Sequence, residues 1–128
     1  MRVMVAAALD LCCVIVFVVI GRSSHDEAGS LAGAATTAWP FLVGMAAGWA
    51  ASRAWRNPAG LVPVGVAVWL ATVALGMVLR AVSGQGTALA FAVVSLIFLG
   101  VTMLGWRAVA RHLRLFGRTL GTRSTSAR

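Results

Sequence analysis

Four long apolar runs, separated by short polar segments, dominate the amino-acid sequence. They cover residues 3–20, 36–51, 61–79 and 87–106. A helix that crosses about 30 Å of hydrocarbon needs about 20 residues, and the four runs are near this length. The second run is the shortest, and a locally thinned bilayer would accommodate it. The pattern therefore predicts four membrane-spanning helices.

The polar segments between the runs are short and contain helix-breaking residues. Pro58 and Gly60 interrupt the second connection, and residues 83–86 of the third connection read Ser-Gly-Gln-Gly. Short connections of this kind make successive helices antiparallel neighbours. We therefore expect an all-α fold, with an up-down four-helix transmembrane bundle over residues 1–112. Residues 113–128 are expected to form a basic cytoplasmic tail that is helical at first and then disordered.

Composition and charge narrow the class of protein. The chain is 60% apolar and 11% charged, with a mean hydropathy of +0.92. Soluble domains carry about 25% charged residues, so a soluble enzyme, a disordered chain and a disulfide-stapled secreted module are excluded. The net charge of +8 would suggest nucleic acid as the partner of a soluble protein. Membrane proteins collect arginine in their cytoplasmic segments, however, so we predict no nucleic-acid partner.

The distribution of the eleven basic residues, all arginine, predicts the orientation. Nine of them fall at the N-terminus, in the second connection and in the tail, which an up-down bundle places on one side of the membrane. These nine are Arg2, Arg53, Arg56, Arg107, Arg111, Arg114, Arg118, Arg123 and Arg128. The other two, Arg22 and Arg80, fall on the opposite side. The positive-inside rule then places both termini in the cytoplasm. We expect the chain to lie in the cytoplasmic (inner) membrane.

A single acidic residue, Asp10, interrupts the first apolar run. It lies about 15 Å from the outer end of its predicted helix. An ionised carboxylate at this depth costs about 3 kcal/mol or more unless it has a partner. Counting depth along the other helices places Thr72 and Ser95 at the same level. The three residues predict a polar site within the membrane, which fits both a proton or small-solute site and a structural hydrogen bond.

The second apolar run contains residues that are expected to serve helix packing. Gly44 and Gly48 have the spacing that lets two helix backbones approach closely, either within one chain or between two copies. Pro40 is expected near the start of its helix, where a missing N–H group costs little. Phe41 follows it and is expected to pack against a neighbouring helix.

A second polar cluster is predicted on the outer side of the membrane. It contains Arg22, His25 and Arg80, together with the acidic pair Asp26 and Glu27. Such a cluster is able to bind an anionic headgroup or solute. The alternative is a solvated loop whose arginines reach toward lipid phosphates. The adjacent His, Asp and Glu match no standard ligand spacing, so no metal site is predicted.

The start of the basic tail predicts contact with lipid. Arg107, Arg111, Arg114 and Arg118 are spaced by four, three and four residues, so they share one face of a helix. Anionic lipids stabilise such a helix by about 1 kcal/mol for each arginine near the surface. We expect these four side chains to contact the anionic inner leaflet.

Several of these residues occur in an order that resembles the DUF3054 family of small bacterial and archaeal multi-pass membrane proteins. The resemblance covers roughly residues 5–112. It rests on Asp10, Phe17-Val-Val-Ile-Gly-Arg22, His25, Thr37-Ala-Trp-Pro-Phe41, Trp69-Leu-Ala-Thr72, Gly76, Leu79-Arg80, Phe91 and Trp106-Arg107. It implies the four-span fold but no activity, substrate or cofactor. It also implies which positions to test: Asp10, Arg22, His25, Pro40, Phe41, Thr72 and Arg80.

Three hypotheses of function follow. The leading one is an inner-membrane protein that moves a proton or small solute through the polar site around Asp10, as a homodimer or larger assembly. The alternatives are a non-catalytic accessory subunit of a membrane complex, and a membrane-embedded lipid-acting enzyme that uses His25 with Arg22 or Arg80. The sequence has no nucleotide-binding glycine loop, H-E-x-x-H motif or G-x-S-x-G motif. We therefore predict no catalytic residue and no cofactor, and favour a protein that is not an enzyme.

Overall fold

The structure, a computed structural model, describes residues 2–24, 31–86 and 88–126, and within these ranges it contains helices and turns but no strand. The four main helices are α1 (Val3–Ser24), α2 (Leu31–Ser52), α3 (Val66–Val82) and α4 (Leu89–Ser126). Two short segments, η1 (Ala54–Arg56) and η2 (Leu61–Gly65), connect α2 to α3. The helices supply four segments that are long and apolar enough to cross a membrane. The predicted all-α fold with four spans is confirmed, and the chain is a multi-pass membrane protein.

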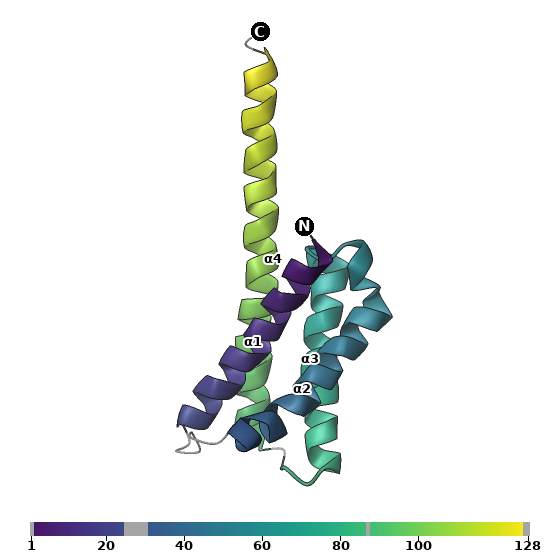
Figure 1. Cartoon of the computed structure of the whole chain (residues 1–128), viewed down its shortest axis with the longest axis vertical. Helices are drawn as coiled ribbons and strands as arrows, with labels where there is room; N and C mark the ends of the chain where they lie inside the picture. Colours follow the sequence, from purple (N-terminus) through teal and green to yellow (C-terminus); the bar gives the residue numbers. More distant parts are fainter. Residues whose placement is uncertain (1, 25–30, 87, 127–128) are drawn as a thin grey trace.

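The bundle has two distinct ends (Figure 1). One end carries the start of α1, the connection between α2 and α3, and the part of α4 that extends beyond the other helices. The opposite end carries the C-terminal end of α1, the start of α2, and the turn from α3 to α4. We refer to these as the terminal end and the far end.

The closest packing in the bundle joins α2 to α3. Gly44 and Gly48 are buried at this contact. A Cβ atom added at Gly44 would lie 2.8 Å from the carbonyl oxygen of Ala71, and one added at Gly48 would lie 2.9 Å from the Cα atom of Val68. Side chains larger than hydrogen would therefore separate the two helices. This glycine face closes the monomer, which was one of its two predicted uses.

The second span is longer than the apolar pattern predicted. Helix α2 begins at Leu31 rather than near residue 36, and its 22 residues extend about 33 Å. The small apolar residues between positions 31 and 35 continue the helix, so no thinning of the bilayer is required. Pro40 consequently lies well inside α2 and is buried, and the expected position near the helix start is wrong. Its missing N–H removes one hydrogen bond from the middle of α2.

Aromatic rings fill the core toward the far end. Phe41 is fully buried, and its ring meets that of Phe17 edge to face, with centroids 5.4 Å apart. Phe91 lies within 6.0 Å of both rings. Gly76 of α3 makes room for Phe41, because a Cβ there would lie 2.6 Å from the ring. This cluster joins all four helices, and two of its rings, Phe17 and Phe91, line the pocket described below.

Helix α4 is also longer than predicted. It runs without interruption for 38 residues, so the basic tail is a continuation of the fourth span. Within the described residues the helix extends as far as Ser126. Val109 and Leu113 are exposed on the extension.

Candidate functional site

The buried charges of the molecule meet near the terminal end. Asp10 of α1 and Arg107 of α4 are both fully buried and form a two-pronged ion pair. Arg107 Nη1 donates to Asp10 Oδ1 at 2.8 Å, and Nη2 donates to Oδ2 at 2.7 Å. Trp106 Nε1 donates to Oδ1 and Trp49 Nε1 donates to Oδ2, both at 2.8 Å. Each carboxylate oxygen therefore accepts two hydrogen bonds.

The guanidinium group of Arg107 has further partners. Its Nε donates to the carbonyl oxygen of Pro58 at 3.0 Å, and Nη1 also donates to that of Met103 at 3.1 Å. The guanidinium carbon lies 4.3 Å from the centre of a ring of Trp106. We name Asp10, Trp49, Trp106 and Arg107 the Asp10 clamp. It ties α1, α2, α4 and the connection before η2 into one network in which both charges are satisfied.

The clamp corrects two expectations from the sequence. Arg107 is fully buried and does not contact the lipid surface as predicted. Thr72 and Ser95 are fully buried but donate to backbone carbonyls of their own helices, at 2.6 Å to Val68 and 2.9 Å to Ala92, and not to Asp10.

The depth of Asp10 was estimated wrongly because it was counted from the outer end of the first predicted helix. Asp10 lies only seven residues from the start of α1, or about 10 Å. Its partners therefore lie near the terminal end of the bundle: Trp49 on α2, and Trp106 and Arg107 on α4. A usable signal was present, because an acid in a span requires a partner and Arg107 is the first cation after the fourth apolar run.

The other predicted lipid-contacting residues differ from Arg107. Arg111 and Arg114 are exposed on the extension of α4, where contact with anionic lipid stays a prediction. The side chain of Arg118 lies outside the described part of the structure, as does His25 of the predicted outer cluster.

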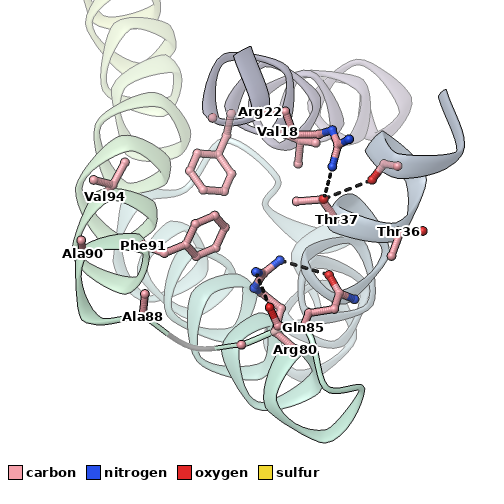
Figure 2. Close-up of a pocket in the computed structure, with 14 residues that line it drawn as sticks. Val18, Arg22, Thr36, Thr37, Arg80, Gln85, Ala88, Ala90, Phe91 and Val94 are labelled. Carbon is pink, nitrogen blue, oxygen red and sulfur yellow. Dashed lines mark hydrogen bonds between the residues drawn. The ribbon is translucent and has the colours of Figure 1, made fainter. Parts of the chain in front are cut away.

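A pocket of about 690 Å³ lies at the far end and is lined by residues from all four main helices. It contains both arginines that sequence analysis placed on this side. Arg22 projects from α1 and Arg80 from α3, and Figure 2 shows the two side chains on different sides of the pocket. They are the charged residues that line it among those described.

Neutral polar groups orient both arginines. Arg22 Nη1 donates to Thr37 Oγ1 at 3.1 Å, and Thr37 in turn donates to the carbonyl oxygen of Gly33 at 3.1 Å. Arg80 donates from Nη1 to the side-chain oxygen of Gln85 at 3.1 Å, and from Nη2 to its backbone carbonyl at 3.3 Å. The tight turn that returns Gln85 to Arg80 is flanked by glycines with positive φ.

The remaining lining is largely apolar. The guanidinium carbon of Arg80 lies 4.2 Å from the centre of the Phe91 ring, a cation–π contact that also holds the arginine in place. Phe17, Val18 and Val94 complete much of this surface. The sequence singled out Arg22 and Arg80 for this end, but it gave no part to Gln85 or Phe17. Gln85 lies in a short turn with no recognisable motif, and the apolar pattern does not distinguish Phe17 from the other residues of the first span.

The described residues contain no group of three His, Cys, Asp or Glu side chains that could hold a metal ion. The candidate site is the pocket at the far end, because it joins two oriented guanidinium groups to an aromatic and aliphatic wall.

Comparison with known proteins places the chain without assigning an activity. Residues 7–110 match the family described as "Protein of unknown function (DUF3054)", which covers most of the chain. No curated protein and no solved structure matches the chain. The family match ends at Ala110, so most of the extension of α4 lies beyond it.

Proposed function

Because the chain belongs to the DUF3054 family of unknown function, we propose from its geometry that it binds an anionic group between Arg22 and Arg80. The observation that carries this proposal is the convergence of two arginines, from α1 and α3, on one pocket of about 690 Å³. Binding of an anion by the outer arginines was one of the uses predicted from the sequence.

The chemistry of the two arginines supports this proposal. A guanidinium group presents five N–H donors in a planar fork that fits phosphate and carboxylate oxygens. Thr37 and Gln85 hold the two forks in place, so less conformational entropy is lost when a ligand binds.

The geometry does not favour Asp10 as a site of proton or solute transfer. Both of its oxygens already accept two hydrogen bonds each, from Arg107 and from two indole N–H groups. Protonation would remove the charge that Arg107 requires. We propose that the Asp10 clamp fixes the helices and that the ligand binds at the far end.

We also propose that the terminal end faces the cytoplasm of a cell whose inner membrane holds the chain. Nine arginines were assigned to this side from the sequence, and subtracting the buried Arg107 leaves eight against two. The positive-inside rule supports the same orientation with this lower count. The pocket with Arg22 and Arg80 then opens toward the outer leaflet.

Binding of inorganic phosphate tests the central proposal. The protein is placed in nanodiscs of zwitterionic phosphatidylcholine, and the ³¹P resonance of phosphate is followed during titration. Arg22→Gln and Arg80→Gln are each expected to weaken binding at least tenfold, because an ionic hydrogen bond contributes about 1.5–3 kcal/mol. Arg111→Gln, an exposed arginine outside the pocket, is the matched control. Equal binding by all four proteins would refute the proposal.

A further inference from the structure

The pocket is much larger than an inorganic anion requires. Its volume of about 690 Å³ falls in the range of about 300–1,000 Å³ that is typical of sites for drug-sized ligands. The arginines and their polar partners occupy only part of its lining. The aromatic rings of Phe17 and Phe91, with Val18 and Val94, form a second wall that has no use in binding a small anion.

The apolar wall continues onto the surface of α4. Ala90 and Val94 line the pocket and are also exposed, Val94 to 54%. Both lie at the start of the candidate span Leu89–Gly117, where an exposed apolar side chain is able to contact lipid. In Figure 2 these residues lie along α4 on one side of the pocket, while Thr36 and Thr37 of α2 lie on the other. The pocket therefore runs from a polar wall on α2 and α3 toward the lipid-facing side of α4.

We infer that the ligand is an amphiphile with a phosphate or carboxylate headgroup and one alkyl or isoprenoid chain. The inference rests on the proposed function and names its ligand class. The headgroup lies between Arg22 and Arg80, where both guanidinium forks reach its oxygens. The chain lies against Phe17 and Phe91 and leaves the pocket past Val94 into the hydrocarbon.

The two parts of such a ligand match the two walls. Phosphate and carboxylate oxygens accept hydrogen bonds from arginine, and such ionic hydrogen bonds are stronger than those between neutral groups. Each methylene group of the chain that leaves water raises the affinity about fourfold. Entry from the bilayer also requires no passage of the chain through water. A small soluble anion would use the arginines and leave the apolar wall without a partner.

Chain length and charge separate this inference from its alternatives. The probes are inorganic phosphate, n-butyl phosphate, n-octyl phosphate and the uncharged n-octyl glucoside. Each is titrated against protein in phosphatidylcholine nanodiscs, and partition into protein-free nanodiscs is subtracted. Octyl phosphate is expected to bind more than 100-fold more tightly than inorganic phosphate, with butyl phosphate between them. Octyl glucoside is expected to show no saturable binding.

A pair of matched variants tests the path of the chain. Val94→Trp fills the lipid-facing side of the pocket, whereas Val101→Trp places the same side chain at an exposed site of α4 that does not line it. Val94→Trp is expected to weaken the binding of octyl phosphate at least tenfold and to leave the affinity for inorganic phosphate within twofold of the wild type. Val101→Trp is expected to change neither. Ala90→Leu repeats the test with a smaller change, and circular dichroism checks the helix content of each variant.

The outcomes distinguish the inference from the proposed function. If inorganic and octyl phosphate bind equally and both depend on Arg22 and Arg80, the ligand is a soluble anion and only the inference is overturned. If replacing Arg22 or Arg80 leaves the binding of every phosphate probe unchanged, the proposed function is overturned as well. If octyl glucoside binds as tightly as octyl phosphate, the pocket recognises chains alone and both are overturned. Equal effects of Val94→Trp and Val101→Trp overturn the proposed path of the chain.

Discussion

Replacing Asp10 by Asn tests the structural role of the buried ion pair. The substitution keeps the shape of the side chain but removes its charge and one of its two acceptor atoms. Each carboxylate oxygen accepts one bond from Arg107 and one from an indole. In either orientation, the new NH₂ group therefore faces one arginine nitrogen and one tryptophan nitrogen, and both of these donors lose their acceptor.

The expected loss of stability follows from this geometry. A hydrogen bond to a charged group contributes about 1.5–3 kcal/mol, and both lost bonds are accepted by the carboxylate, so together they amount to about 3–6 kcal/mol. An independent estimate agrees: breaking a buried ion pair by removing one partner costs about 3–5 kcal/mol, because the remaining charge stays desolvated. Both ions are fully buried, so no discount for solvent screening applies. We expect Asp10→Asn to lower the free energy of unfolding by about 4 kcal/mol.

Unfolding by SDS in mixed micelles, followed by circular dichroism, measures this loss. A second comparison isolates the buried charge. Asp10→Leu leaves Arg107 without a counter-ion, whereas Asp10→Leu with Arg107→Met removes both charges, so the double variant is expected to be the more stable of the two. The reasoning fails if Asp10→Asn lies within about 1 kcal/mol of the wild type, or if the double variant is less stable than Asp10→Leu.

Three other predictions concern packing, ion-pair geometry and orientation. Gly44→Ala is expected to destabilise the chain by about 1–3 kcal/mol, because its Cβ would lie 2.8 Å from the carbonyl oxygen of Ala71. The control is Gly105→Ala, whose Cβ would meet nothing within 4 Å and which should not destabilise the chain in the same SDS assay. Arg107→Lys keeps the charge but not the fork that bridges both oxygens of Asp10, so a loss of about 1–3 kcal/mol is expected, and wild-type stability would contradict this account. An alkaline phosphatase fused after Arg128 is expected to be inactive in a bacterial host, and one inserted in the turn between α3 and α4 active; the reverse pattern would overturn the proposed orientation.

The spans were predictable because membrane thickness fixes the length of an apolar run. The same rule underestimated α2, because the weakly apolar residues before position 36 did not stand out from the polar loop, although they continue the helix. The location of Arg22 and Arg80 was also predictable, since both end a helix on the same side of an up-down bundle. Their meeting in one pocket required the arrangement of all four helices, which apolar periodicity does not specify.

The ion pair of Asp10 and Arg107 was missed for a different reason. The two residues are separated by 97 positions, and charge rules assign an arginine at the end of a span to the lipid surface. That rule describes populations of arginines and says nothing about which of them has a buried acid within reach. Tryptophans near the end of a span are typical of the membrane interface, but the indole N–H groups of Trp49 and Trp106 donate to the buried carboxylate of Asp10.

Under the proposed function, the two ends of the bundle use arginine for opposite purposes. At the terminal end, Arg107 meets a carboxylate whose oxygens accept four hydrogen bonds, and the group is fully buried. At the far end, Arg22 and Arg80 are oriented by a hydroxyl and an amide and line a large pocket. A charge pair without room for a ligand stabilises the fold, whereas oriented donors around a cavity are preorganised for binding. Substitutions in the Asp10 clamp should therefore change unfolding before binding, and substitutions of Arg22 or Arg80 should change binding before unfolding.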